Sequence, residues 1–216
     1  MTLIDKYKLI KNKINQLSKN VTFIAVSKTF SLNYIKPLID YGHLDYGENK
    51  VQEAIEKWSS LIISRKDIKL HMLGRVQSNK VDLATKIFSY IHSLDNEKIA
   101  NKFALAQYKL NKQLKYFVQI NVGDENQKGG INTLLAPDFI KFCQYDLKLN
   151  IIGLMCIPPI NISPNIYFSQ LQKINVASNL KELSMGMSSD YESAIKFGST
   201  FVRIGSSLFG NRINVS

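Results

Sequence analysis

The sequence predicts an α/β fold and, within that class, a single (β/α)₈ barrel of the TIM type. Short apolar runs alternate with helical patterns along the chain, and small or polar residues follow the runs. Eight such runs can be traced, which is the number that closes a barrel of this type. A doubly wound open sheet is the alternative, because it is built from the same alternation. We take residues 1–216 as one domain, since no linker or internal repeat divides them.

The expected elements follow one another in strict order. An amphipathic helix over about 2–18 is expected to open the chain and to pack on the fold as a lid, because its apolar residues recur at helical spacing with lysines between them. Strands are expected at 23–27, 44–46, 69–73, 90–93, 116–122, 151–155, 180–185 and 200–204. The helices between them are expected at 31–41, 49–64, 78–88, 96–111, 132–145, 165–178 and 189–198, with a short last helix after the eighth strand.

Charge and composition bear on the class of partner. The formal net charge is +11, from 28 Lys and Arg against 17 Asp and Glu, which raises the hypothesis of a nucleic-acid-binding protein. Only four of these cations are arginines, and no basic cluster carries interleaved aromatic residues. Specific base recognition favours the bidentate arginine fork, so we expect no specific nucleic-acid partner. An anionic small ligand suits the same charge.

The two cysteines and the hydropathy pattern indicate the compartment. Cys143 and Cys156 are isolated and lack the spacing of metal ligands, so we expect neither a metal site nor a disulfide. Free thiols of this kind fit a reducing compartment. No apolar stretch approaches the length of a signal-peptide core or a membrane span. We therefore expect a cytoplasmic protein that has no membrane partner.

Lys28 is the most informative single residue. It directly follows the apolar run 23–27, and is therefore expected at the carboxyl end of a buried strand, where barrels of this type build their sites. Burial disfavours the charged ammonium, and a neutral amine can form a Schiff base with a carbonyl ligand. The alternative is a solvated surface lysine, since the chain is rich in lysine.

Two loops near the end of the chain have the composition of a phosphate site. The segment 205–207 leads from the last expected strand into a helical turn whose amides and hydroxyls can point at an anion. Barrels commonly hold phosphate after strands seven and eight, so Ser184 and Ser188 are natural partners of this segment. An alternative role for Ser188 and Ser189 is to cap the helix that follows them, and both roles are compatible.

Arg203 lies inside the apolar run 200–204, where an unpaired charge would be costly. It needs a carboxylate, a carbonyl or a ligand. In a cofactor site, a permanently protonated guanidinium can donate to a pyridine nitrogen, which keeps that nitrogen unprotonated and weakens the ring as an electron sink. A structural salt bridge is the alternative, and the sequence favours neither.

Several motifs occur together and in order from about residue 25 onward. They read AVSKT at 25–29, YGENKVQE at 46–53, HMLGRVQSNK at 71–80, IGLM at 152–155 and LSMGMSSD at 183–190, and they continue through 194–195, 198–200 and 202–205 to 209–210. As a set they resemble the pyridoxal phosphate homeostasis proteins, also known as the YggS/PROSC family. The resemblance implies a barrel of the alanine racemase N-terminal type, which is fold type III among proteins that bind pyridoxal 5′-phosphate (PLP).

The resemblance also implies a function. It implies that PLP is held as an aldimine on Lys28, by a monomer that buffers PLP or delivers it to apo-enzymes and has no established turnover. Arg203 falls where the family places the partner of the pyridine nitrogen. The other cofactor-binding residues that it implies are Asn49 and Lys128, near the cofactor, and Ser184, Ser188, Gly205 and Ser206, in the phosphate-binding stretches.

A PLP-dependent amino-acid racemase is the alternative. A racemase of this fold type uses the lysine and a tyrosine from a second, β-rich domain across a dimer, and we expect no such domain after the eighth strand. Tyr46 is the tyrosine nearest the expected rim, and it is expected to pack against the barrel wall. Without a second base, proton exchange on the opposite face of the ring should be slow.

Overall fold

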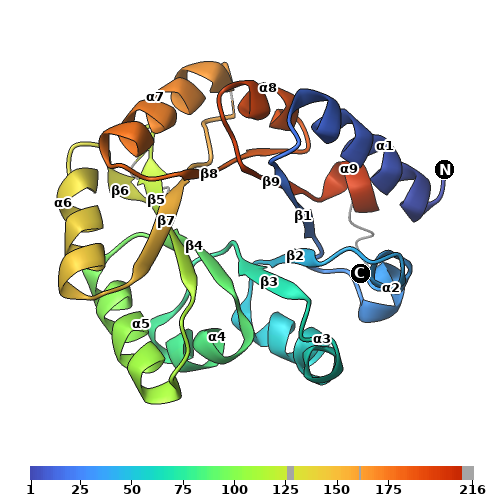
Figure 1. Cartoon of the computed structure of the whole chain (residues 1–216), viewed down its shortest axis with the longest axis horizontal. Coiled ribbons are helices and arrows are strands. Elements are labelled where there is room, and N and C mark those ends of the chain that lie inside the picture. The colour runs from blue at the N-terminus through green and yellow to red at the C-terminus, as the bar shows by residue number, and fades with distance from the viewer. Residues whose placement is uncertain (126–128, 161, 211–216) are drawn as a thin grey trace.

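The computed structural model describes residues 1–125, 129–160 and 162–210. Eight parallel strands form a barrel, and helices surround it (Figure 1). The barrel strands are β1 (Thr22–Val26), β2 (Asp45–Glu48), β3 (Lys69–Met72), β4 (Tyr90–Leu94), β5 (Lys115–Asn121), β7 (Asn150–Met155), β8 (Glu182–Met187) and β9 (Phe201–Ile204). A short additional strand, β6 (Ile131–Asn132), pairs with β5 beside the barrel and was not expected from the sequence.

The strand order determines which residues meet at the rim. Neighbouring strands run β4-β3-β2-β1-β9-β8-β7-β5, and pairing of β4 with β5 closes the ring. This closure confirms the (β/α)₈ barrel and excludes the open sheet. The first and last strands of the barrel pair with each other, and Ile24 of β1 lies opposite Arg203 of β9. The loop that carries Lys28 and the strand that carries Arg203 are therefore neighbours, although they lie at opposite ends of the sequence.

The helices pack on the outer face of the barrel. They are α1 (Leu3–Leu17), α2 (Leu32–Asp40), α3 (Val51–Ser64), α4 (Val81–Ile87), α5 (Glu97–Leu110), α6 (Ala136–Lys141), α7 (Pro164–Ala177), α8 (Tyr191–Lys196) and α9 (Ser206–Phe209), with a 3₁₀ turn η1 (Ser78–Lys80) and a π-helical turn η2 (Phe142–Asp146). The helix expected over 132–145 starts later, because β6 takes up its first residue. Helix α1 packs against α2, α8 and α9 and fills the outer ring beside the short α9 (Figure 1).

Local sequence explains where the longer helices begin and end. The Thr2 hydroxyl accepts from the Asp5 amide, and the Asp5 carboxylate accepts from the Thr2 amide, which forms a capping box at the start of α1. Asn96 caps the start of α5 through its side-chain oxygen. The C-cap residue of α5 is Asn111, whose φ of 44° is the left-handed conformation that asparagine tolerates.

Side chains alternate across each strand, so the barrel has an outer and an inner core. Phe23 and Ala25 of β1 belong to the large cluster between strands and helices. Ile24 and Val26, on the other face, belong to a small separate cluster. The other buried members of that cluster are Tyr90, Phe117, Met155 and Phe201. Buried polar side chains contact these rings, among them two histidines, which is unusual for the interior of such a barrel.

Cys143 and Cys156 are both buried free thiols. Burial raises the pKa of each thiol to about 12, so both stay protonated and act as small core side chains. Within the described ranges, no helix combines the length and the apolar character needed to cross a membrane.

Candidate functional site

A cavity of about 490 Å³ opens at the carboxyl ends of the barrel strands. Its apolar lining includes Val26, Leu73, Met155, Ile157 and Met187. Six of the residues predicted from the sequence line its polar part, namely Lys28, Asn49, Ser188, Arg203, Gly205 and Ser206. The other two do not join them: Ser184 is absent from the lining, and Lys128 lies outside the described residues.

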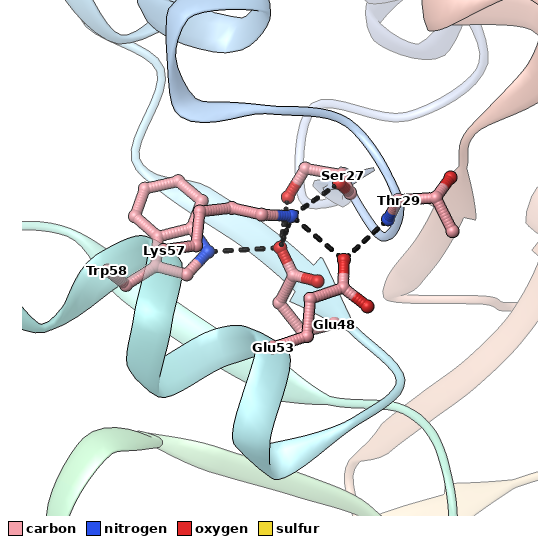
Figure 2. A network of polar contacts seen from close by, with 6 residues as sticks. All are labelled: Ser27, Thr29, Glu48, Glu53, Lys57 and Trp58. Atoms are coloured by element: carbon pink, nitrogen blue, oxygen red, sulfur yellow. Dashed lines mark hydrogen bonds and ion pairs between the residues drawn. The ribbon is translucent and has the colours of Figure 1, made fainter. Parts of the chain in front are cut away.

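Lys28 stands in a tight turn directly after β1, and side chains of α3 hold the backbone on both sides of it. Lys28 itself is half-buried. The next residue, Thr29, has a φ of 70°, a left-handed conformation that costs a non-glycine residue about 1–2 kcal/mol. The Thr29 amide donates to Glu53 Oε1, and Lys57 Nζ donates to the Ser27 carbonyl at 2.8 Å (Figure 2). These two contacts hold the turn in the conformation that presents Lys28 to the cavity.

Glu48, the last residue of β2, is at the centre of this network. Its side chain is fully buried. Its Oε1 atom accepts from Ser27 Oγ at 2.7 Å, from Lys57 Nζ at 2.9 Å and from Trp58 Nε1 at 3.0 Å (Figure 2). Lys57 also contacts Glu53 at 3.1 Å, so one ammonium links both carboxylates to the turn. A buried carboxylate is costly unless it is paired and hydrogen-bonded, and here both conditions are met at Oε1.

Sequence reasoning missed this network. Glu53 and Lys57 are four residues apart on an expected helix, a spacing that signals an ion pair on one helix face. Glu48 stands two residues after the expected strand 44–46, a position that signals a rim carboxylate. The sequence does not show that α3 packs against the turn after β1. This packing brings Glu48, Glu53 and Lys57 to the residues on either side of Lys28.

Arg203, in β9, is 5% exposed, and within the described part of the chain no carboxylate lies at ion-pair distance from it. Its Nη1 donates to the carbonyl and the hydroxyl oxygen of Ser184, both at 2.7 Å, and its Nη2 donates to the Cys156 carbonyl at 2.8 Å. Burial lowers the pKa of Arg203, while Cys156 and Asp190 act to raise it. The guanidinium remains a cation because its ordinary pKa is so high.

Ser184 is fully buried within β8 and faces the barrel interior. Its hydroxyl accepts from Arg203 and lies 2.8 Å from Nδ1 of His92. The hydroxyl is therefore taken up by protein groups, away from the lining of the cavity. This geometry gives no support to the predicted phosphate role of Ser184 and makes it instead a partner of Arg203.

Ser188 joins the loop after β8 to the turn between β9 and α9. Its Oγ accepts from the amides of Gly205 and Ser207, each at 3.3 Å. The N-cap residue of α8 is Asp190, which makes no side-chain capping bond, so the hydrogen bonds of Ser188 serve the cavity wall and not the start of that helix. Ser188, Gly205 and Ser206 thus form one continuous polar side of the cavity.

Gly186 explains how β8 delivers Ser188 to the cavity. Its φ is 92°, and a Cβ atom at this position would lie 2.6 Å from the Cβ of Ala194 in α8. Only glycine avoids both the left-handed strain and the clash. The register of β8 against β9 shifts between Ser184 and Met187, and this shift separates the inward-facing Ser184 from the cavity-lining Ser188.

The polar groups of the cavity suit a small organic anion that carries a carbonyl group. Lys28 offers an amine that can attack such a carbonyl, and the serine side offers hydroxyls to an anion. Arg203 uses three of its five N–H groups within the protein, which leaves two for a ligand. In the described residues, no group of three His, Cys, Asp or Glu side chains is placed to hold a metal ion.

Comparison with known proteins agrees with the fold. The family model described as the alanine racemase N-terminal domain matches residues 3–212. The pyridoxal phosphate homeostasis protein of Synechocystis is 38% identical over 93% of this chain and 95% of its own length. The pyridoxal phosphate homeostasis protein of Escherichia coli is 32% identical over 96% of this chain and 93% of its own length. The barrel is therefore of the alanine racemase N-terminal type. The chain belongs to the pyridoxal phosphate homeostasis protein family.

Solved structures extend the comparison. PipY of Synechococcus elongatus, solved with PLP bound, superposes with a TM-score of 0.88 at 29% identity and covers 97% of this chain and 100% of its own. The same protein solved without PLP gives a TM-score of 0.90. Alanine racemase of Clostridium difficile gives 0.74 at 14% identity, covering 98% of this chain and 58% of its own, which is a likeness of fold alone.

The network around Glu48 generates a stability prediction. We expect Lys57→Met to lower the free energy of unfolding by about 3–5 kcal/mol, because Glu48 would stay buried without its cation. Urea denaturation at neutral pH measures this loss. The matched control is Lys36→Met, which breaks the exposed Lys36–Asp40 pair and should change stability little. Equal losses in the two variants would contradict a role for Lys57 in compensating the buried charge.

Proposed function

We propose that this chain binds PLP in the cavity at the carboxyl ends of the strands, holds it on Lys28, and takes part in PLP homeostasis by buffering or delivering the cofactor. The observation that carries the proposal is that one cavity gathers an amine, a buried guanidinium and a serine-rich anion site. Further support comes from a relative of the same fold, 29% identical, that has been solved with PLP bound.

The residues of the cavity fit the three polar parts of PLP. Lys28 takes the aldehyde as a Schiff base, with release of water. Arg203 donates an N–H to the ring nitrogen and keeps it unprotonated. Ser188, Gly205 and Ser206, which line one side of the cavity, would hold the phosphate.

Two predicted residues have less structural support. Asn49 lines the cavity near the Lys28 turn and keeps its proposed place near the cofactor. Lys128 keeps its proposed place near the cofactor on the family resemblance alone. Bound PLP would supply an electron-withdrawing ring. The protein groups around the ring, Arg203 among them, would set how strongly the ring withdraws electrons.

The proposal is for a carrier and not for a racemase. Among the described residues that line the cavity, Lys28 and Arg203 are the ones with a titratable side chain. Tyr46, the tyrosine nearest the rim, is fully buried against Trp58 with its ring centroid 4.8 Å away, so it packs in the barrel wall. A second base for the opposite face of the ring is therefore not offered by these residues.

The proposal includes the setting in which the carrier works. We infer a cytoplasmic monomer that passes PLP to apo-enzymes. Two buried free thiols, which a reducing compartment preserves, support the location. The names of the curated relatives, all homeostasis proteins, support the role.

Lys28 should be the residue that becomes labelled when the loaded protein is reduced with borohydride. Peptide mapping should place a phosphopyridoxyl mass on the segment that contains Lys28, because the rim of the cavity presents this amine. The Lys28→Ala protein should lose the label, and Lys57→Arg, which keeps the buried charge, should retain it. Label spread over many lysines in both the wild type and Lys28→Ala would contradict the assignment.

The serine side of the cavity should discriminate between PLP and pyridoxal. Charged hydrogen bonds contribute about 1.5–3 kcal/mol each, so we expect PLP to bind at least ~100-fold more tightly. Titration followed by absorbance measures both affinities. Ser206→Ala should reduce the ratio, whereas Ser193→Ala, on the outer helix α8, should leave it unchanged. Equal affinity of the wild type for the two compounds would rule out this phosphate site.

Turnover should be negligible. General acid–base catalysis by one group contributes ~10²–10⁴-fold, so a site without the second base should exchange the α-proton of L- or D-alanine little faster than free PLP does. Deuterium exchange followed by NMR measures this rate, and incubation with an apo-enzyme measures transfer of PLP. Efficient racemisation of a common amino acid, abolished in Lys28→Ala, would replace the carrier with an enzyme.

A further inference from the structure

A chain of polar side chains, buried except for its last member, crosses the barrel interior beneath the cavity. It leads from Arg203 through a serine and two imidazoles to a carboxylate at the amino end of β2. The distances are 2.7 Å from Arg203 Nη1 to Ser184 Oγ, 2.8 Å from Ser184 Oγ to His92 Nδ1, 3.0 Å from His92 Nε2 to His71 Nδ1, and 3.1 Å from His71 Nε2 to Asp45 Oδ1. Barrel interiors of this type are ordinarily filled with branched apolar side chains, so the polar chain departs from the usual packing.

The hydrogens of this chain can be assigned from its two ends. A guanidinium only donates, so Ser184 Oγ accepts from Arg203 and has its own proton left to donate to His92 Nδ1. His92 then carries its proton on Nε2 and donates to His71 Nδ1. His71 in turn donates from Nε2 to the Asp45 carboxylate, which only accepts. The reverse assignment would leave a lone pair of His71 facing the carboxylate. All four bonds therefore point in one direction.

The surroundings keep both imidazoles neutral. Tyr90 stacks on His71 at 4.3 Å and Phe117 stacks on His92 at 4.4 Å. Burial lowers the pKa of His71, against the opposing effect of Asp45, and Lys69 lowers it further. Burial lowers the pKa of His92 well below its ordinary value, and His71 and Arg203 add to the shift.

Asp45, at the far end, stays ionised. Burial acts to raise the pKa of its carboxyl, but the hydrogen bond from His71 and the positive charge of Lys69 lower it overall. The chain therefore joins a fixed cation at the rim to a fixed anion near the opposite end of the barrel, through neutral groups whose hydrogen bonds all point the same way.

We propose that this chain of hydrogen bonds positions Arg203 for its ligand. Its four positioning residues are Ser184, His92, His71 and Asp45. The inference rests on the proposed function, because the ligand group that Arg203 meets is the ring nitrogen of a PLP-type compound. Ser184 holds both hydrogens of Nη1, one on its carbonyl and one on its hydroxyl. The guanidinium plane is thereby fixed, and its two remaining N–H groups keep one direction. The chain thus determines how strongly the site prefers a ring nitrogen over a ring C–H.

The test compares two ligands that cannot react with Lys28. These are pyridoxine 5′-phosphate and its analogue in which C–H replaces the ring nitrogen. The ratio of their dissociation constants reports the bond from Arg203 and is insensitive to a general loss of binding. For the wild type we expect a preference for the nitrogen compound of roughly ten-fold or more. In Ser184→Ala we expect the ratio to fall most of the way to unity.

Ser199→Ala is the matched control. Ser199 is another buried serine between β8 and β9, 2% exposed, and its hydroxyl donates to the Met185 carbonyl at 2.7 Å. The Ser199→Ala variant also loses a buried serine hydroxyl, but one that lies outside the chain of hydrogen bonds. It should therefore keep the wild-type ratio of the two dissociation constants. If Ser184→Ala weakens both ligands in the same proportion, the positioning role is wrong. If the wild type binds neither ligand, the proposed function fails and the positioning role fails with it.

A second measurement needs no ligand. Long-range ¹H–¹⁵N spectra of the histidine rings should show His71 and His92 as neutral Nε2–H tautomers between about pH 6 and about pH 8. Asp45→Asn keeps an oxygen acceptor for His71 and should preserve both tautomers. This variant therefore separates the hydrogen-bond pattern from the negative charge of Asp45. An Nδ1–H tautomer or a protonated ring at His92 in the wild type would overturn the one-directional chain, whatever the ligands do.

Discussion

Burial of the Arg203 guanidinium at the rim constrains the groups around it, because a cation removed from water needs an oxygen acceptor for each N–H that does not meet a ligand. Two backbone carbonyls and a serine hydroxyl meet this need, and the described residues put no carboxylate beside it. A neighbouring carboxylate would occupy the remaining N–H groups. Solvating the cation with neutral oxygens leaves these groups for a ligand in the cavity that Arg203 lines.

The turn that carries Lys28 follows a different rule. There the charges are paired: Lys57 meets two carboxylates, and the pair lies behind the turn, away from the cavity lining. The network stiffens the backbone on both sides of Lys28. One end of the site is thus a fixed donor, and the other is a reactive side chain on a fixed backbone. This combination suits the proposed carrier, which would hold a reactive compound in one orientation, and the described residues that line the cavity offer no second base.

Much of the fold follows from the sequence, because period-two alternation and turn residues report local structure. All eight expected barrel strands are present, and Lys28 and Arg203 lie where the apolar runs on either side of them indicated. Sequence reasoning failed where side chains from distant strands meet. Ser184 and Ser188 looked equivalent as phosphate partners, and only the register shift at Gly186 separates them.

The interior histidines show the same limit. His71 and His92 stand in expected strands, but nothing in the local pattern says that their rings touch or that they continue to Arg203. A strand period gives the face on which a side chain lies, whereas the height of that side chain in the barrel depends on the shear of the closed sheet. Polar networks in a barrel interior are set by this second quantity, which one sequence does not reveal.

The central claim is that Arg203 donates to the ring nitrogen of bound PLP and keeps it unprotonated. The ¹⁵N chemical shift of PLP labelled at the ring nitrogen, measured on the loaded protein, tests this claim most directly. The account predicts the shift of an unprotonated, hydrogen-bonded pyridine nitrogen that does not change between about pH 6 and about pH 8, since the donor is a guanidinium that does not titrate there. The shift of a pyridinium, with a proton bonded to the nitrogen, would contradict it.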